Sequence, residues 1–342
     1  MPSIKTIIFE FLDCAPPILK VLIGAAHQRT PLAMNTASFQ ENIQGFSIAG
    51  LRNDALEIRV IPTLGGKICS IVSRKTKREW MWRPPGDWDL FTNPFGDDFN
   101  NSTIVGADEC IPTISECVWH SHTYPDHGEA WSLSWTLHEK ALLEQQRLIC
   151  RVTLPTSGLE LEREITLKDQ SIQFQYRLSN PTEGKLNYLW AWHPLFTLQE
   201  GDRLVLPEKC DRVTVTASLN CGMDSAPATV AWPSPNPQLR FNEFHLGDNT
   251  QSRIKLFTPP LTEGRALIQN SRTGDQLEIH FNPAHNPFLG VWINRGGWNN
   301  FHNFAVEPTN MNTDSLTGAP ASAQNQILAG ATKEWKVELK VS

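Results

Sequence analysis

The sequence lacks the short motifs that mark several large classes of enzyme. Its 342 residues contain no G-x-G-x-x-G after a strand pattern and no G-x-x-x-x-G-K-[ST], so nothing in the sequence supports nucleotide binding. It also has no G-x-S-x-G elbow and no H-E-x-x-H pair. These absences argue against an α/β-hydrolase and against a zinc peptidase of the zincin type.

Positive charge and long apolar runs are also scarce. The chain has 30 Lys and Arg against 36 Asp and Glu, a net charge of −6, and no basic stripe that could displace counterions from a nucleic acid. Residues 7–23 are fairly apolar, but acids, prolines and a lysine interrupt them well short of the roughly 20 apolar residues of a membrane-spanning helix. We therefore expect neither a nucleic acid nor a membrane as partner.

The cysteines lack the pairing of a disulfide framework or a zinc ribbon. There are seven, an odd number, and no C-x-x-C, so we expect reduced, buried thiols in a cytoplasmic protein. Two acids in the apolar N-terminal segment argue against a signal peptide. Because strand patterning begins only after Met34, we expect residues 1–33 to be an appendage, or the product of an upstream start, outside a single domain at residues 35–342.

What the sequence does have is strict alternation of apolar and polar residues, which predicts half-buried strands. Scattered Gly (21) and Pro (24) residues supply turns between them, and no stripe of helical period or fixed repeat is present. The prediction is an all-β protein built as one large antiparallel β-sandwich. The alternating segments include residues 56–60, 131–137, 148–154, 172–178, 186–192, 277–281 and 335–341.

Three short segments place a His or a Glu beside a glycine or a proline. They are Tyr-Pro-Asp-His127-Gly-Glu-Ala-Trp, Leu-Trp-Ala-Trp-His193-Pro-Leu-Phe and Asn-Phe-Ala-Val-Glu307-Pro-Thr. Proline holds the preceding residue extended and lacks a donor for the strand ladder, so we expect His193 and Glu307 each to end a strand. Side chains fixed in this way suit a preorganised catalytic site. Trp192, on the opposite strand face from His193, is expected in the core.

In this order, the three segments resemble the aldose 1-epimerase (galactose mutarotase-like) family. The H-P-x-F containing His193 is similar to the family's catalytic His motif, and the E-P of Glu307, with a later Asp-Ser-Leu, is similar to its catalytic Glu motif. The H-G of His127 is similar to the first, substrate-binding His. The resemblance spans most of residues 45–340 and implies the galactose mutarotase-like supersandwich.

The resemblance implies interconversion of the α and β anomers of an aldose by acid–base ring opening. Glu307 would be the base at the anomeric hydroxyl and His193 the acid at the ring oxygen, exchanging roles on closure. We expect the two groups several ångströms apart, on opposite sides of a bound ring. Ordinary pKa values of about 4.3 for Glu and about 6.5 for His suit these roles, so no metal or organic cofactor is required.

The resemblance also implies that His127 hydrogen-bonds a small-molecule sugar. Glu129 and Trp131 stand where the family usually shows other residues. Trp131 or Trp192 could stack on the sugar, although Trp192 is expected in the core. Asn294 is a further candidate, because its segment Phe-Leu-Gly-Val-Trp-Ile-Asn-Arg-Gly-Gly is similar to a strand and turn of uncharacterised bacterial members.

The stretch before the H-G departs from the family pattern, which has an Asn-Arg pair there. This chain reads Gly-Ala-Asp108-Glu109-Cys, without an Arg. Asp108 and Glu109 either bind sugar hydroxyls in its place or cap a turn. The identity of the sugar stays open. With no basic cluster near the motifs, a phosphosugar is less favoured, and Arg295 is its one candidate cation.

Three other interpretations stay open. The first is a metal site, because zinc ligands do occur at spacings such as that of His120, His122, Asp126 and His127. The second is a glycoside-cleaving enzyme, which would need a second carboxylate, and Glu129 is the candidate partner of Glu307. The third is a non-catalytic carbohydrate-binding protein of the same fold, which would need no acid–base pair.

Overall fold

The structure is a computed structural model that describes residues 35–223, 226–236, 239–245, 247, 250–317, 322 and 324–342. The expectation that residues 1–33 form an appendage falls outside the described residues.

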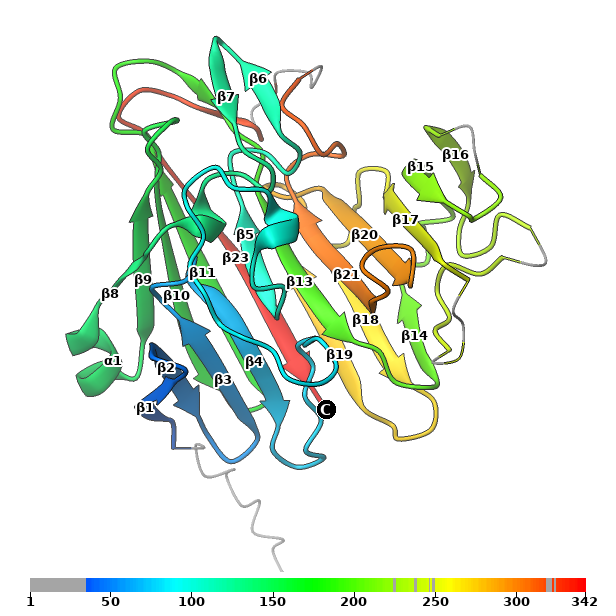
Figure 1. The fold of residues 1–342 in the computed structure, drawn as a ribbon, viewed down its shortest axis with the longest axis horizontal. Helices are drawn as coiled ribbons and strands as arrows, with labels where there is room; N and C mark the ends of the chain where they lie inside the picture. The colour runs from blue at the N-terminus through cyan, green and yellow to red at the C-terminus, as the bar shows by residue number, and fades with distance from the viewer. Residues whose placement is uncertain are drawn as a thin grey trace, which may run out of the picture. The chain divides into compact units, whose positions relative to one another are not determined.

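Two large antiparallel sheets make up most of this part of the chain (Figure 1). The 11-stranded sheet contains, in spatial order, β1 (Ala37–Ile43), β2 (Phe46–Arg52), β3 (Leu56–Ile61), β4 (Lys67–Ser73), β5 (Ala107–Cys110), β13 (Ala191–Thr197), β21 (His302–Thr309), β20 (Phe288–Arg295), β17 (Ser252–Phe257), β15 (Arg212–Leu219) and β16 (Ala228–Ala231). The 8-stranded sheet contains β14 (Asp202–Val205), β18 (Arg265–Asn270), β19 (Gln276–Phe281), β23 (Thr332–Val341), β11 (Ser171–Ser179), β10 (Glu160–Lys168), β9 (Leu148–Thr153) and β8 (Thr136–Leu137).

The remaining elements are short. They are the strand pairs β12 (Leu186–Asn187) with β22 (Gln326–Ile327) and β6 (Cys117–Trp119) with β7 (His122–Tyr124), the helix α1 (Glu139–Gln145), and the 3₁₀ turns η1 (Phe99–Asn101) and η2 (Ala130–Ser132).

The two sheets pack through one apolar core, as alternation predicted. In β10 and β11, for example, every second side chain is buried and its neighbours are not. Trp192 is fully buried in this core, with its ring 5.5 Å from that of Phe174, and so joins the 11-stranded sheet to the 8-stranded one. The prediction of a large antiparallel β-sandwich is confirmed.

The predicted strand at 131–137 is wrong. Trp131 belongs to η2, and only Thr136–Leu137 forms the short β8. The indoles of Trp131 and Trp135 donate hydrogen bonds to the backbone carbonyls of Asp126 and Ala130. Both rings are buried by these local turns, so the apolar alternation is satisfied without an extended strand.

His193 and Glu307 do not end their strands, contrary to prediction. Both β13 and β21 continue through the following proline. Ala191 pairs with Thr309 and Leu195 with Ala305, while the positions between have no ladder pairing. The prolines remove donors at this point without stopping the strands. Midway in the register, His193 therefore lies opposite Glu307 on the neighbouring strand.

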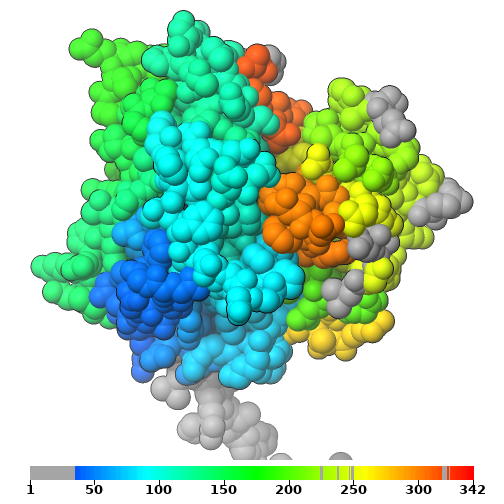
Figure 2. Space-filling model, in the orientation of Figure 1, coloured from blue at the N-terminus to red at the C-terminus, as the bar shows by residue number. Residues whose placement is uncertain are grey.

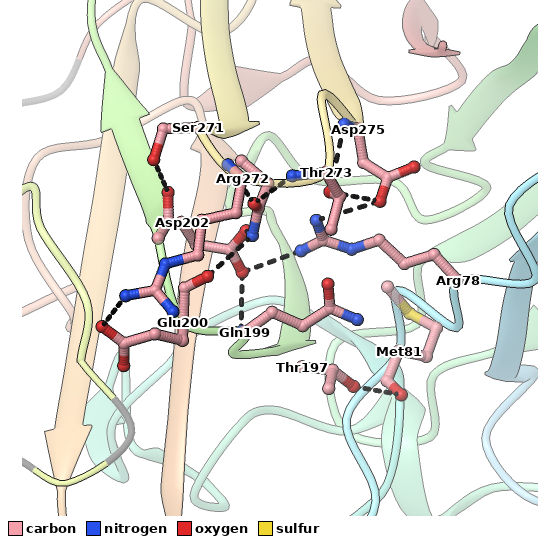
Figure 3. A network of polar contacts seen from close by, with 12 residues as sticks. Arg78, Met81, Thr197, Gln199, Glu200, Asp202, Ser271, Arg272, Thr273 and Asp275 are labelled. Atoms are coloured by element: carbon pink, nitrogen blue, oxygen red, sulfur yellow. Dashed lines mark hydrogen bonds and ion pairs between the residues drawn. The ribbon is translucent and has the colours of Figure 1, made fainter.

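A buried ionic cluster joins the loop after β4 to the turn between β18 and β19 (Figure 3). Arg78 donates a hydrogen bond of 2.8 Å to Asp202, and its other terminal nitrogen lies 4.0 Å from Asp275. Asn270 donates to the second oxygen of Asp202 at 2.9 Å, and the guanidinium lies 3.7 Å from the ring centre of Trp80. None of these residues belongs to the three motifs.

No helix in the described ranges is long and apolar enough to cross a membrane. The described cysteines are buried, apart from Cys221, which is half-buried.

Candidate functional site

A cavity of about 420 Å³ brings two of the three sequence motifs together. It lies over β13 and β17 of the 11-stranded sheet and reaches η1 and the segments around residues 114, 126 and 314. A larger hollow, about 600 Å³, is lined by residues of β8 to β11 and lies away from the motifs, so we centre the site on the smaller cavity. The cavity is lined by Phe99, Asn100, Ile114, Ser115, Asp126, His127, His193, Leu195, Ala217, Arg253, Lys255, Trp292, Trp298 and Asp314.

His193 and Glu307 are in direct contact at this cavity. Nδ1 of His193 lies 3.0 Å from Oε1 of Glu307, at ion-pair distance but without the alignment of a hydrogen bond. The expectation of several ångströms between them is therefore not met, because the strand register sets them face to face. His193 lines the cavity, whereas Glu307 is fully buried beside it.

Lys255 holds the other oxygen of Glu307. Its ammonium donates a hydrogen bond of 2.5 Å to Oε2 and lies 3.7 Å from Asp314. Burial by itself would raise the pKa of Glu307, but the charges of Lys255 and His193 outweigh that effect and bring the pKa down to about 2. Glu307 is therefore ionised at every pH near neutrality.

A glycine makes room for this carboxylate. Gly290 of β20 pairs with Glu307 in the strand register. A Cβ at this glycine would lie 2.8 Å from Oε2 of Glu307 and 3.2 Å from the ring of Phe257. The missing side chain thus leaves room for the Glu307 carboxylate at the position where it contacts Lys255.

His127 forms a second carboxylate–imidazole pair on the cavity wall. Nδ1 of His127 lies 3.0 Å from Oδ2 of Asp126, and hydrogen bonding to His127 lowers the pKa of Asp126 against the opposing effect of burial. The imidazole stacks on Phe99 at 3.7 Å between ring centres, and its centre is 5.2 Å from that of His193. The backbone of His127 has a φ of 58°, and the glycine after it also has a positive φ.

Two loops meet at the cavity. Figure 2 shows the segment before β5 (cyan) beside the loop between β20 and β21 (orange). The indole of Trp298 donates a hydrogen bond of 2.6 Å to the side chain of Asn100, which links the two loops. Asn294 is fully buried and binds the backbone N–H and carbonyl of Trp298 through its amide, at 3.0 Å each.

Two of the predicted substrate-binding residues, Asn294 and Trp131, lie behind the side chains that line the cavity and hold them in place. Asn294 holds the Trp298 loop in place with both ends of its amide already used. Trp131 is 2% exposed, donates to the carbonyl of Asp126 and packs edge-on against Phe99. It lies beneath the ring that lines the cavity, so stacking of Trp131 on a sugar does not fit its position.

Asp108 and Glu109 neither bind at the cavity nor cap a turn. Both lie in β5 and are buried. Asp108 accepts hydrogen bonds from the ammonium of Lys67 at 2.6 Å to each oxygen. Glu109 accepts from Arg163 and, within the sandwich core, from two aromatic side chains. Their carboxylates are satisfied by protein donors, so we withdraw both from the set of substrate-binding residues.

The two alternative uses of acidic and His residues receive no support. Glu129 is fully buried and accepts hydrogen bonds from the backbone N–H groups of Thr156 and Ser157, which removes it as a partner for glycoside cleavage. In the part of the chain that the structure describes, no group of three or more His, Cys, Asp and Glu side chains is arranged to hold a metal ion.

The cations of the site were missed from the sequence. Lys255 and Arg253 lie on one face of β17 and both line the cavity. In the sequence they alternate with Ile254 and Leu256, a pattern that equally describes a strand with its charged side chains in solvent. Arg295, the cation suggested earlier, is instead buried and donates to the backbone carbonyls of residues 240 and 243.

Comparison with known proteins identifies the fold. No protein-family model and no curated protein matches the chain. Among solved structures, a galactose mutarotase-like protein from Clostridium acetobutylicum is 12% identical with a TM-score of 0.63, and the match covers 91% of this chain and 99% of that one.

Two further structures agree. A proposed aldose 1-epimerase from Klebsiella pneumoniae is 16% identical with a TM-score of 0.63, over 88% of this chain and 81% of that one. A galactose mutarotase-like protein from Lactobacillus casei is 14% identical with a TM-score of 0.58, over 86% and 100%. At these identities the similarity concerns the fold alone, and the described part of the chain has the fold of the galactose mutarotase-like proteins.

Proposed function

We propose that the protein is an isomerase of the aldose 1-epimerase type, which interconverts the α and β anomers of a sugar bound in the cavity. The observation that carries this proposal is the contact between His193 and Glu307 at the cavity. A carboxylate and an imidazole side by side supply a proton acceptor and a proton donor, and proton transfer in both directions needs both.

The chemistry requires one proton to leave the sugar and one to arrive. Glu307 takes the proton of the anomeric hydroxyl while His193 gives a proton to the ring oxygen, and the bond between C1 and that oxygen breaks. Rotation about C1–C2 presents the other face of the aldehyde, and the reverse transfers close the ring. Because the anomeric oxygen and the ring oxygen are both bonded to C1, a base and an acid in contact can serve both.

The rest of the cavity suits a sugar ring. Its volume of about 420 Å³ lies within the range of small-molecule sites. Phe99, Trp292 and Trp298 offer aromatic faces for C–H groups, and His127, steadied by Asp126, offers a hydrogen-bond partner for hydroxyls. This supports the role of His127 in substrate binding.

A second function, sugar binding without catalysis, is favoured by one observation. Glu307 is fully buried, and a carboxylate whose pKa is about 2 is a weak base. If Lys255 holds the carboxylate in this state when a sugar is bound, the site recognises its ligand and transfers no proton.

Proton NMR of freshly dissolved α-aldoses separates the two functions. An isomerase shortens the time in which the anomeric signals reach their equilibrium ratio, in proportion to protein concentration. A binding protein changes the line widths or shifts of the sugar signals and leaves the equilibration rate at its uncatalysed value. Protein denatured by heat is the matched control, and no acceleration with any aldose of a neutral and acidic panel would refute the isomerase.

A further inference from the structure

Arg253 is a cation at the cavity that forms an ion pair with no carboxylate among the described residues. It is half-buried in β17 and lines the cavity. Among the described residues, its side chain makes one hydrogen bond, of 3.4 Å, from Nη1 to the carbonyl of Gly297. A guanidinium carries five N–H donors, so most of its donors are left for a ligand.

The other charged groups of the cavity already have partners. Lys255 lies against Glu307 and Asp314, and Asp126 lies against His127. Because Arg253 is only half-buried, water can reach part of its guanidinium, and an anionic ligand in the cavity could take the place of that water. The guanidinium geometry matches the two oxygens of a carboxylate or a phosphate, with which Arg forms paired hydrogen bonds.

We propose that Arg253 binds an anionic group of the substrate, so that the sugar is an acidic aldose carrying a carboxylate or a phosphate away from its anomeric carbon. This inference rests on the proposed function, because it takes the sugar to be the ligand of this cavity. It names a substrate class that the sequence motifs leave open.

The position of Arg253 fits this role. Arg253 and Lys255 are two residues apart on the same strand face, which separates their backbones by about 7 Å. Lys255 contacts Glu307, where the anomeric carbon reacts, so Arg253 lies farther along the strand, near the Trp298 loop. An exocyclic acidic group, on the carbon at the other side of the ring oxygen, would extend in that direction.

The test compares galacturonate and glucose 6-phosphate with galactose and glucose in the anomer-exchange NMR assay. We expect at least one acidic sugar to show a kcat/KM about tenfold or more above its neutral counterpart. Arg253→Gln should raise KM for the acidic sugar about 10- to 100-fold, several times more than it raises KM for the neutral sugar, while Arg253→Lys retains part of the preference. Arg177→Gln, at an exposed, ion-paired position in β11, is the matched control.

The possible outcomes separate this inference from the proposed function. Equal turnover of neutral and acidic sugars, unaffected by Arg253→Gln, overturns the role of Arg253 and leaves the isomerase standing. Binding of an acidic sugar without acceleration, lost in Arg253→Gln, supports the anion site and overturns the isomerase. Neither acceleration nor binding with any of the four sugars overturns both.

Discussion

Glu109 and Glu307 are both fully buried carboxylates in neighbouring parts of the same sheet, yet their surroundings differ. Glu109 accepts hydrogen bonds from Arg163, Tyr176 and Trp190, each at 2.9 Å, in the closed core of the sandwich. Glu307 has a lysine on one oxygen, while its other oxygen lies beside His193 without an aligned donor. Only the second carboxylate lies next to a cavity-lining residue.

The difference shows that burial and an ion pair do not by themselves distinguish a carboxylate at a cavity from one in a closed core. At Glu109 the acceptor oxygens are used by protein donors, so the group can only stabilise or destabilise the fold. At Glu307 one acceptor is left over where an imidazole reaches the cavity, so the group can take part in proton transfer. Four predictions test this distinction.

The largest effect on turnover is expected from the proposed acid–base pair, His193 and Glu307. His193→Ala and Glu307→Gln should each lower kcat for anomer exchange by about 10²–10⁴-fold, because each removes one proton-transfer group. Stopped-flow polarimetry or NMR line-shape analysis with a confirmed substrate measures the loss.

The matched control is Glu109→Gln, which makes the same chemical change at the other fully buried carboxylate. It should lower stability and leave kcat close to that of the unaltered protein. Equal loss of turnover in Glu109→Gln and Glu307→Gln would mean that both act only through the fold.

Removing the cation that pairs with Glu109 should lower stability and not turnover. Arg163→Met leaves the carboxylate of Glu109 buried without its counterion, and removal of one partner of such a pair costs about 3–5 kcal/mol. Urea unfolding followed by tryptophan fluorescence measures this loss. The double variant with Glu109→Gln should recover part of it, since no buried charge then remains. A loss below about 1 kcal/mol in Arg163→Met contradicts the description of this cluster.

Much of the fold was readable from the sequence, because strands such as β11 and β23 bury every second residue and alternation reports that directly. That His193 and Glu307 share one site could be anticipated only through the resemblance of their motifs to a family, and their direct contact was not anticipated. Alternation says nothing about which strands are neighbours in the sheet.

The ion-pair partners of the charged residues could not be predicted from the sequence. Asp108 and Glu109 adjoin one another and are candidates from sequence either for sugar binding or for capping a turn, but their cations, Lys67 and Arg163, lie 41 and 54 residues away in the chain. Lys255 was missed for the same reason, since its partner Glu307 is 52 residues away. Ion pairs between strands depend on register and sheet order, which a single sequence does not state.

A methyl group at Gly290 should disturb the contacts of Glu307 with Lys255 and His193 specifically. In Gly290→Ala the new methyl group would lie 2.8 Å from Oε2 of Glu307, so the carboxylate must shift away from Lys255. We expect a loss of about 1–3 kcal/mol in stability, typical of overpacking, together with lower kcat. Gly184→Ala, at a glycine with open space around it, is the control and should change neither. Unchanged kinetics in Gly290→Ala would show that the exact position of the carboxylate is unimportant.

The smallest effect, and the most direct comparison of the two carboxylates, is their opposite dependence on pH. The pKa of Glu307 falls from 4.5 to about 2 on folding, because Lys255 and His193 outweigh burial, so its contribution to stability is lost as the pH falls from about 4.5 toward 2. Burial dominates at Glu109 and raises its pKa despite Arg163, so protonation of Glu109 favours the folded state as the pH falls. Urea unfolding between about pH 6 and pH 3 measures the free energy of unfolding of the unaltered protein and of each variant. As the pH falls, the difference between the unaltered protein and Glu307→Gln should shrink, and the difference between the unaltered protein and Glu109→Gln should grow in favour of the unaltered protein. If both differences move in the same direction, the two carboxylates do not differ electrostatically in the way their contacts indicate.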